Sequence, residues 1–229
     1  MRYPYLLFDA DNTLFDFDAA QRIAHQTVCA RANLPFTEEN YALYHRCNAA
    51  LWRDYDRGLC TKEFLLVERF RRYLKASGET GDPERMCADH IDALGSSAIL
   101  LPGALELCRH LHAAGHRLYL ITNAVAAVQS RRFAASALVP YFEEGFISDT
   151  VGCGKPQKAY FDYIFQTVPG LRPDNCLVIG DSLSSDIQGA NNAGLPCCWY
   201  NPKGAERPAD LRIDYETRTL EEILPIAGQ

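Results

Sequence analysis

The chain has 229 residues, of which 48% are hydrophobic and 23% are charged. This balance is typical of a globular protein, and the length allows one core domain with an insertion. With 29 acidic and 23 basic residues the net charge is −6, which argues against non-specific binding of nucleic acid, because such binding requires a basic surface.

The nine cysteines are odd in number and include no C-x-x-C spacing. They therefore predict neither a disulfide framework nor a zinc site, and free thiols favour a cytoplasmic protein. No apolar run is long enough to span a bilayer, and the first motif already occupies the N-terminus, so we expect neither a membrane span nor a cleaved signal. The six histidines are scattered and join no motif.

The first predicted strand, Tyr5–Asp9, ends in two acidic residues, Asp9 and Asp11. Alternate residues of an extended segment point the same way, so both carboxylates could face one ligand. One could attack phosphorus while the other transfers protons. A phosphate ester adds further negative charge, which a divalent cation with oxygen ligands such as Mg2+ would neutralise. The alternative is an ordinary strand followed by an Asx-type turn.

Between this strand and the next, the pattern is helical only. The predicted helices are Phe17–Ala32, Thr37–Arg57, Thr61–Ala76 and Pro83–Leu94. Breaks fall at Gly58 and Gly78. We therefore expect an all-α cap domain of residues 16–97, inserted into a core domain of residues 1–15 and 98–229. A cap of this kind excludes water from a site and contacts the substrate.

The segment Trp52–Leu59 is predicted to join two cap helices. Arg53 or Arg57 could meet an anionic or hydrogen-bonding part of a substrate, and Trp52 or Tyr55 could stack against a base. The alternative is that the aromatic residues pack between helices and the arginines form a solvated face.

Short β-rich runs return after the insertion and alternate with helical patterns. They are Arg117–Thr122, Gly145–Ser148, Cys176–Asp181 and Pro196–Asn201. Strands that alternate with helices predict an α/β fold, a Rossmann-like doubly wound parallel sheet with right-handed crossovers. Its ligand should lie beyond the carboxyl ends of the strands.

Three later segments, two of these runs and the loop Gly152–Pro156, carry residues suited to phosphate chemistry. Thr122 and Asn123 precede a helix from about Ala124, where backbone N–H groups and the hydroxyl could bind phosphate oxygens or simply cap the helix. Lys155 follows two glycines and is predicted to head a helix started by Pro156, although a Gly-Lys-Pro string is often only a loop. The last run ends at Asp181, near Asp186, and offers a further metal ligand.

Two aspartates, a hydroxyl, a lysine and further acids, in this order and each at an element end, resemble the haloacid dehalogenase superfamily from Tyr5 to about Thr217. The resemblance is to its phosphatase branch with a helical cap. It implies that Asp9 is the nucleophile and Asp11 the general acid and base. The remaining implied roles are phosphate binding by Thr122, Asn123 and Lys155, Mg2+ binding by Asp9, the Asp11 carbonyl and Asp181, and support by Thr13 and Asp186.

Loop details resemble bacterial pyrimidine 5′-nucleotidases. They are Gly180–Ile187, Asn192–Gly194, Cys198–Pro202 and Asp214–Glu216. A nucleoside 5′-monophosphate is thus the expected substrate, with no nucleic acid polymer or membrane as partner and with a monomer and a homodimer both open.

Other reactions of the superfamily fit the motifs to different degrees. The presence of Asp11 disfavours a dehalogenase or a phosphonate hydrolase. A sugar-phosphate phosphatase and a phosphosugar mutase remain open. A regulatory binding module on the same fold would be expected to have lost a motif residue, and none is lost.

Overall fold

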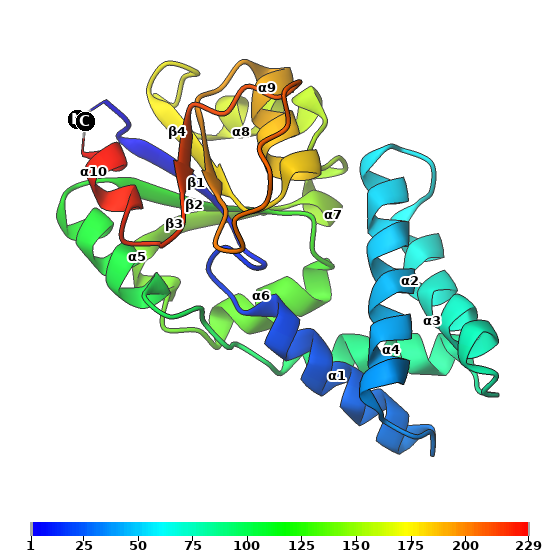
Figure 1. Cartoon of the computed structure of the whole chain (residues 1–229). Helices are drawn as coiled ribbons and strands as arrows, with labels where there is room; N and C mark the ends of the chain where they lie inside the picture. The colour runs from blue at the N-terminus through cyan, green and yellow to red at the C-terminus, as the bar shows by residue number, and fades with distance from the viewer. Residues whose placement is uncertain (1, 229) are drawn as a thin grey trace. The chain divides into compact units, whose positions relative to one another are not determined.

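The computed structural model describes residues 2–228. Strands and helices alternate through most of the chain, apart from a run of five helices, α1 to α5, between the first strand and the second (Figure 1). In chain order the elements are β1 (Tyr5–Asp9), α1 (Phe17–Arg31), α2 (Glu38–Asp56), α3 (Lys62–Ser77), α4 (Pro83–Gly95), α5 (Ala104–Ala113), β2 (Arg117–Thr122), α6 (Ala126–Ala134), η1 (Val139–Tyr141), β3 (Phe142–Ile147), α7 (Ser148–Val151), α8 (Lys158–Thr167), β4 (Cys176–Gly180), η2 (Leu183–Ile187), α9 (Gln188–Ala193), β5 (Cys197–Tyr200), β6 (Tyr215–Thr217) and α10 (Ile223–Ala227).

The six strands form one sheet in the order β3-β2-β1-β4-β5-β6, and every neighbouring pair is parallel. The four inner strands β1, β2, β4 and β5 are buried on both faces because their side chains alternate between two apolar clusters, whereas the edge strands β3 and β6 are partly exposed. In β1, Leu6 and Phe8 join the cluster that α5 and α10 cover, whereas Leu7 joins the cluster covered by α8 and α9. The predicted fold class, a doubly wound parallel sheet with an inserted helical segment, is confirmed.

The chain divides into two compact units, which we call the core unit (Met1–Phe17 with Ala98–Gln229) and the helical unit (Asp18–Ser97). Side chains cap the helical unit's longer helices: Thr37 accepts a hydrogen bond from Asn40 N at the start of α2, and Thr61 accepts one from Phe64 N at the start of α3. A separate apolar cluster, which includes Tyr44 and Phe70, fills the interior of this unit.

The structure differs from the sequence-based expectation at three places in the core unit. The three-residue strand β6 was not expected, and β3 begins at Phe142 rather than Gly145. Pro156 does not start a helix, because Gln157 N bonds to the Gly154 carbonyl and closes a turn, so that α8 begins at Lys158.

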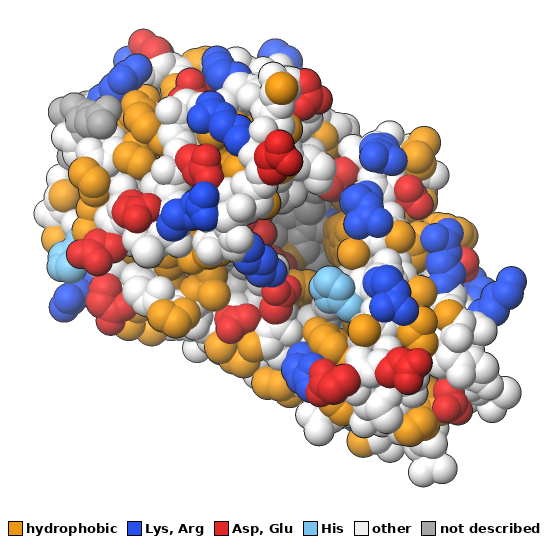
Figure 2. Space-filling model, in the orientation of Figure 1, with side chains coloured by type: hydrophobic (Ala, Val, Ile, Leu, Met, Phe, Trp, Pro, Cys, Tyr) orange, Lys and Arg blue, Asp and Glu red, His pale blue; other side chains and the backbone are white. Residues whose placement is uncertain are grey.

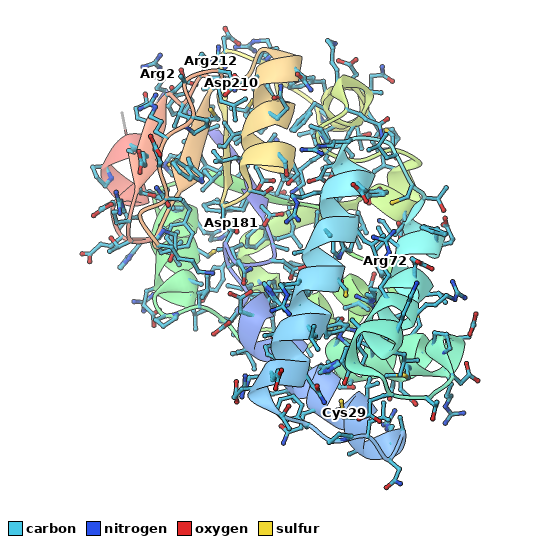
Figure 3. All side chains as sticks on the ribbon, turned by 45° about the vertical axis from the view of Figure 1, so that its right-hand side comes forward. Arg2, Cys29, Arg72, Asp181, Asp210 and Arg212 are labelled. Carbon is cyan, nitrogen blue, oxygen red and sulfur yellow. The ribbon has the colours of Figure 1, made fainter. Side chains whose placement is uncertain are left out.

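Acidic and basic side chains are interspersed on the face of the molecule seen in Figure 2. Among the described residues, no helix combines the length and the apolar character that crossing a membrane requires. Figure 3 locates Asp181 in the core unit, and Cys29 and Arg72 on helices α1 and α3.

Candidate active site

The predicted site residues of the core unit gather at the carboxyl ends of three adjacent strands. Asp9 ends β1, Thr122 ends β2, and Asp181 follows β4. Since β1 lies between β2 and β4, and the chain winds outward from β1 in both directions, this edge is the switch point at which doubly wound sheets bind ligands. Lys155 and Asp186 reach the same place from segments after α7 and within η2.

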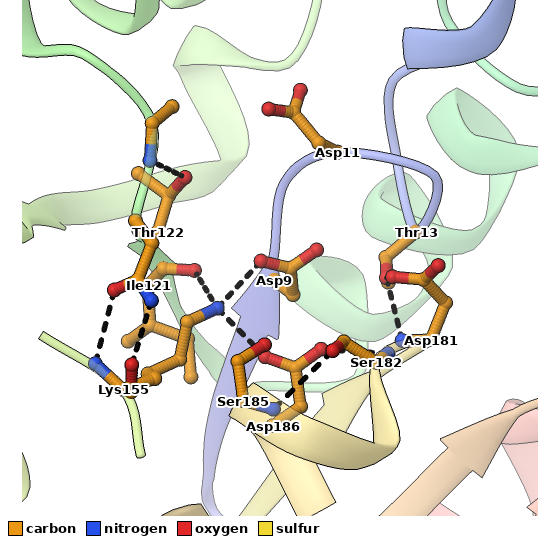
Figure 4. A network of polar contacts seen from close by, with 12 residues as sticks. Asp9, Asp11, Thr13, Ile121, Thr122, Lys155, Asp181, Ser182, Ser185 and Asp186 are labelled. Atoms are coloured by element: carbon orange, nitrogen blue, oxygen red, sulfur yellow. Dashed lines mark hydrogen bonds and ion pairs between the residues drawn. The ribbon is translucent and has the colours of Figure 1, made fainter. Parts of the chain in front are cut away.

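Lys155 is the centre of a buried ion-pair network (Figure 4). Its Nζ donates to Asp9 Oδ1 at 2.5 Å, to Asp186 Oδ1 at 2.7 Å and to the Ile121 carbonyl at 3.0 Å. The Lys155 side chain is 1% exposed and that of Asp186 is 0% exposed, whereas that of Asp9 is 10% exposed. Since an ammonium group has three N–H donors, all three are used in this arrangement, and a phosphate oxygen would have to replace one acceptor.

Burial and crowded negative charge dominate the electrostatics of this network. Burial and the Asp186 carboxylate raise the pKa of Asp9 to about 7, although Lys155 acts in the opposite direction. Burial, followed by repulsion from Asp9 and Asp186, also raises the pKa of Asp181 well above its usual value. For Lys155 burial lowers the pKa, but the carboxylates of Asp186 and Asp9 outweigh it and raise the pKa. The cluster thus contains one ammonium and three carboxylates, and a bound cation would offset the excess negative charge.

The carboxylates themselves provide suitable ligands for such a cation. One ligand oxygen from each of Asp9, Asp181 and Asp186 lies within 4.8 Å of the others. Both oxygens of Asp186 already have partners, because Oδ1 accepts from Lys155 and Oδ2 accepts from Ser182 N at 3.0 Å. Asp9 and Asp181 are therefore the better ligands, and Asp186 holds Lys155. Oxygen donors of this kind suit Mg2+.

Asp181 is fixed by contacts from two sides. Its backbone N–H donates to Thr13 Oγ1 at 3.1 Å, and Thr13 Oγ1 lies 3.5 Å from Asp181 Oδ1. The indole N–H of Trp199, on β5, donates to the Asp181 carbonyl at 2.9 Å. Thr13 thus links the loop after β1 to the loop after β4. The contact of Trp199 could not be predicted, because nothing in its apolar run indicates where the indole points.

Asp11 lies on a tight turn and is directed away from Asp9 (Figure 4). The turn is closed by bonds from Asn12 N to the Phe15 carbonyl and from Leu14 N to the Ala10 carbonyl, and Asn12 adopts a left-handed conformation with φ 61°. Asn tolerates that conformation better than most residues. The Asp11 carboxylate meets Arg132 of α6, whose Nη1 lies 2.5 Å from Asp11 Oδ1. No motif in the sequence indicates this contact.

The side chains of Thr122 and Asn123 form hydrogen bonds to backbone groups of the loops that surround the site. The Thr122 hydroxyl accepts a bond from Ala124 N at 3.0 Å, so it closes the turn after β2 and does not cap α6, whose N-cap is Val125 without a side-chain cap bond. The Asn123 amide brackets Lys155: its Nδ2 donates to the Lys155 carbonyl at 2.7 Å and its Oδ1 accepts from Lys155 N at 3.0 Å. Asn123 therefore positions Lys155.

Two glycines are required by close packing at this site. A Cβ on Gly154 would lie 2.4 Å from Asn123 Oδ1, and a Cβ on Gly180 would lie 2.2 Å from Asp186 Oδ2. Real Cβ atoms do not come so close to other atoms, so both positions exclude a side chain. Gly152 has another role, because it ends α7 in the left-handed conformation with φ 86°.

The specificity candidates Trp52, Arg53 and Arg57 belong to the helical unit. Trp52 and Arg53 lie within the last turns of α2 and Arg57 caps it, so the predicted joining loop is helical through Asp56. The α-helical pattern of residues 38–56 thus continues past Trp52. Trp52 is half-buried and packs edge-on against Tyr55, with ring centroids 5.5 Å apart, while both arginines are exposed.

Comparison with known proteins gives the same family by sequence and by structure. Residues 3–194 match the family model of haloacid dehalogenase-like hydrolases. The chain is 36% identical to the HAD-hydrolase YfnB of Bacillus subtilis, over 98% of this chain and 95% of that protein. It is 35% identical to the pyrimidine 5′-nucleotidase PynA of Streptococcus pneumoniae (98% and 94% covered) and 32% identical to the pyrimidine 5′-nucleotidase YjjG of Escherichia coli (97% of both). A crystal structure of B. subtilis YfnB bound to magnesium superposes with a TM-score of 0.95 at 35% identity and covers all of both chains.

Proposed function

The chain belongs to the haloacid dehalogenase-like hydrolases, and we propose that it is a Mg2+-dependent phosphatase that hydrolyses nucleoside 5′-monophosphates through a phospho-aspartyl intermediate. The observation that carries the proposal is the pairing of Asp9 with the buried Lys155 at the carboxyl end of β1, with Asp11 two residues away. A dehalogenase or a phosphonate hydrolase would have no use for that second aspartate. The names of PynA and YjjG support the substrate class.

The carboxylates present fit a magnesium ion. Asp9 and Asp181 would hold it with the Asp11 backbone carbonyl, and the excess of carboxylates over cations in the Asp9, Asp181 and Asp186 cluster gives a reason for it to bind. The magnesium-bound YfnB structure supports the same choice of metal. When bound, Mg2+ would neutralise charge on the phosphoryl oxygens.

The residues of the chain account for both halves of the reaction. An oxygen of Asp9 forms a bond to phosphorus while the ester P–O bond breaks, and Asp11 gives its proton to the departing ribose oxygen. Asp11 then takes a proton from water, which attacks the phosphorus and releases Asp9. The Lys155 ammonium lowers the pKa of Asp9 and so favours the ionised carboxylate that attacks, and it can follow the phosphoryl group by exchanging its bond to Asp9. Thr122 provides a hydroxyl donor, and Asn123 holds the Lys155 backbone.

Phosphate release from a panel of substrates tests the proposal. The panel contains pyrimidine and purine ribo- and deoxyribonucleoside 5′-monophosphates, sugar phosphates and p-nitrophenyl phosphate, each with Mg2+ and with excess chelator. We expect turnover of nucleotides that stops with chelator and is absent from a folded Asp9→Asn variant. Preference for a sugar phosphate would replace the nucleotidase assignment, and a requirement for a sugar bisphosphate would indicate a mutase. Turnover that survives complete metal removal would contradict the role of magnesium.

Three side chains of the helical unit are the candidates for substrate recognition, namely Trp52, Arg53 and Arg57. Arg53 and Arg57 are exposed and Trp52 is half-buried, so truncating either arginine should leave the fold unchanged. Arg53→Ala and Arg57→Ala should raise KM for nucleotides more than for p-nitrophenyl phosphate if they contact the nucleoside. Arg46→Ala, an exposed arginine on the same helix α2, is the control.

A further inference from the structure

The ion pair between Arg132 and Asp11 lies outside the roles described so far. Arg132 is on the last turn of α6, 121 residues from Asp11 in sequence, and its Nη1 donates to Asp11 Oδ1 at 2.5 Å. The Arg132 side chain is 0% exposed, whereas that of Asp11 is 24% exposed. The pair therefore consists of a buried cation and an accessible carboxylate.

The surroundings of Arg132 hold its guanidinium in one place. Its central carbon lies 4.8 Å from the ring centroid of Phe15 and 5.9 Å from that of Phe17. Gln129, one turn earlier on α6 and fully buried, accepts from the same Nη1 at 3.4 Å. A guanidinium packed against two rings has little freedom to follow a moving partner.

The backbone of Asp11 is equally constrained. Ala10 accepts bonds from Leu14 N and Phe15 N, and Asn12 N bonds to the Phe15 carbonyl. Only the side-chain torsions of Asp11 can therefore change without breaking the turn, and its Oδ1 is bound to Arg132. The carboxylate stands away from Asp9 in Figure 4.

We propose that Arg132 is a positioning residue for Asp11: it binds Oδ1 and so presents Oδ2 to the leaving group and to the attacking water. This inference rests on the proposed phosphatase function, in which Asp11 transfers both protons. A proton-transfer group that is oriented by a third group behind it is a recurring arrangement in enzymes with covalent intermediates. Arg132 does not contact the substrate, because its side chain is entirely buried.

The test compares Arg132→Met, Arg132→Lys and the wild type on two substrates with Mg2+. Arg131→Met, an exposed neighbour on the same helix, is the control. A nucleoside monophosphate has a leaving group that needs a proton, whereas p-nitrophenyl phosphate expels p-nitrophenolate without one. General acid and base catalysis contributes about 10²–10⁴-fold, and mispositioning should lose part of it. For Arg132→Met we therefore expect kcat on the nucleotide to fall about 10–100-fold, with KM changed by less than about threefold.

With p-nitrophenyl phosphate, the same variant should give a burst of nitrophenol that approaches one equivalent of enzyme. The first step needs no acid, while hydrolysis of phospho-Asp9 still needs Asp11. A variant that is merely damaged would give a smaller burst from a smaller active fraction. Arg132→Lys keeps the charge but loses the planar guanidinium, so its activity should lie between those of Arg132→Met and the wild type. If Arg132→Met does not fold, the same two-substrate comparison is made with Arg132→Lys alone.

Two results would overturn the inference separately from the proposed function. A folded Arg132→Met with wild-type kcat on the nucleotide, beside an active wild type, would show that Asp11 needs no positioning by Arg132. An equal loss on both substrates without a burst would assign Arg132 a structural role only. If the wild type releases no phosphate from any substrate, the proposed function fails first, and this inference fails with it.

Discussion

Replacing Lys155 with methionine should lower the free energy of unfolding of the core unit by about 3–5 kcal/mol at neutral pH. The magnitude follows from the burial of the network: the variant leaves the Asp9 and Asp186 side chains, 10% and 0% exposed, without the ammonium that lies 2.5 and 2.7 Å from them. Breaking a buried pair is costly because the remaining charges stay desolvated. The loss should shrink at lower pH, because the raised pKa values of Asp9 and Asp181 make the folded state bind more protons than the unfolded state.

Lys158 provides a matched control. It forms an ion pair with Asp162 at the same distance of 2.5 Å, but the two side chains are 59% and 43% exposed. Lys158→Met should therefore cost at most about 1 kcal/mol. Urea unfolding of both variants can be followed by tryptophan fluorescence in a Trp52→Phe background, which leaves Trp199 of β5 as the reporter in the core unit.

Equal losses for the two lysine variants would refute this reasoning, because they would show that burial does not set the cost of removing the ammonium. A Lys155→Met loss that grows on acidification would contradict it as well. In that case the loss of stability would not come from the Asp9 and Asp186 carboxylates that lack the Lys155 ammonium.

Two further predictions concern packing and acid stability. Gly180→Ala should reduce stability by about 1–3 kcal/mol and abolish most phosphate release, because its Cβ would displace Asp186. The control is Gly145→Ala, whose Cβ would lie 3.7 Å from the nearest side chain and which should change stability by less than about 0.5 kcal/mol. Equal effects of the two variants in urea unfolding would contradict the packing argument. Burial lowers the pKa of His25 to about 4, so the stability that its neutral form gives should be complete above pH 6.5 and lost as pH falls towards 4, by about 3 kcal/mol. His25→Asn should flatten this pH dependence and the exposed His45→Asn should not; a slope that His25→Asn leaves unchanged would show that another group is responsible.

Local patterns were sufficient to predict most of the fold. The β-rich runs ending at Asp9, Thr122 and Asp181 became the three strands that carry the site, because apolar alternation and a polar stop are both local signals. Strand β6 was missed because three residues, Tyr215–Thr217, are too few for a periodic pattern. The start of α8 was misplaced because the turn at Lys155 depends on the Asn123 amide, which lies 32 residues away in sequence.

The contacts between distant segments could not be read from the sequence. Arg132 lies on an ordinary amphipathic helix, and only the packing of α6 against the loop after β1 shows that it meets Asp11. Asp186 was predicted as a supporting residue, but its position between Lys155 and Ser182 N depends on the absence of a side chain at Gly180. Spacing along the chain indicates which residue types could act together, whereas their distances follow from tertiary packing.

Identification of the residue that carries the phosphoryl group tests the central claim most directly. The enzyme would be quenched in acid during turnover of a nucleoside monophosphate with Mg2+, digested and mapped by mass spectrometry, with an Asp11→Asn variant included because slower hydrolysis should increase the trapped fraction. We predict one phosphoryl group on the peptide that contains Asp9, labile to hydroxylamine and absent from Asp9→Asn. Phosphorylation of another residue, or steady turnover by folded Asp9→Asn, would contradict the account.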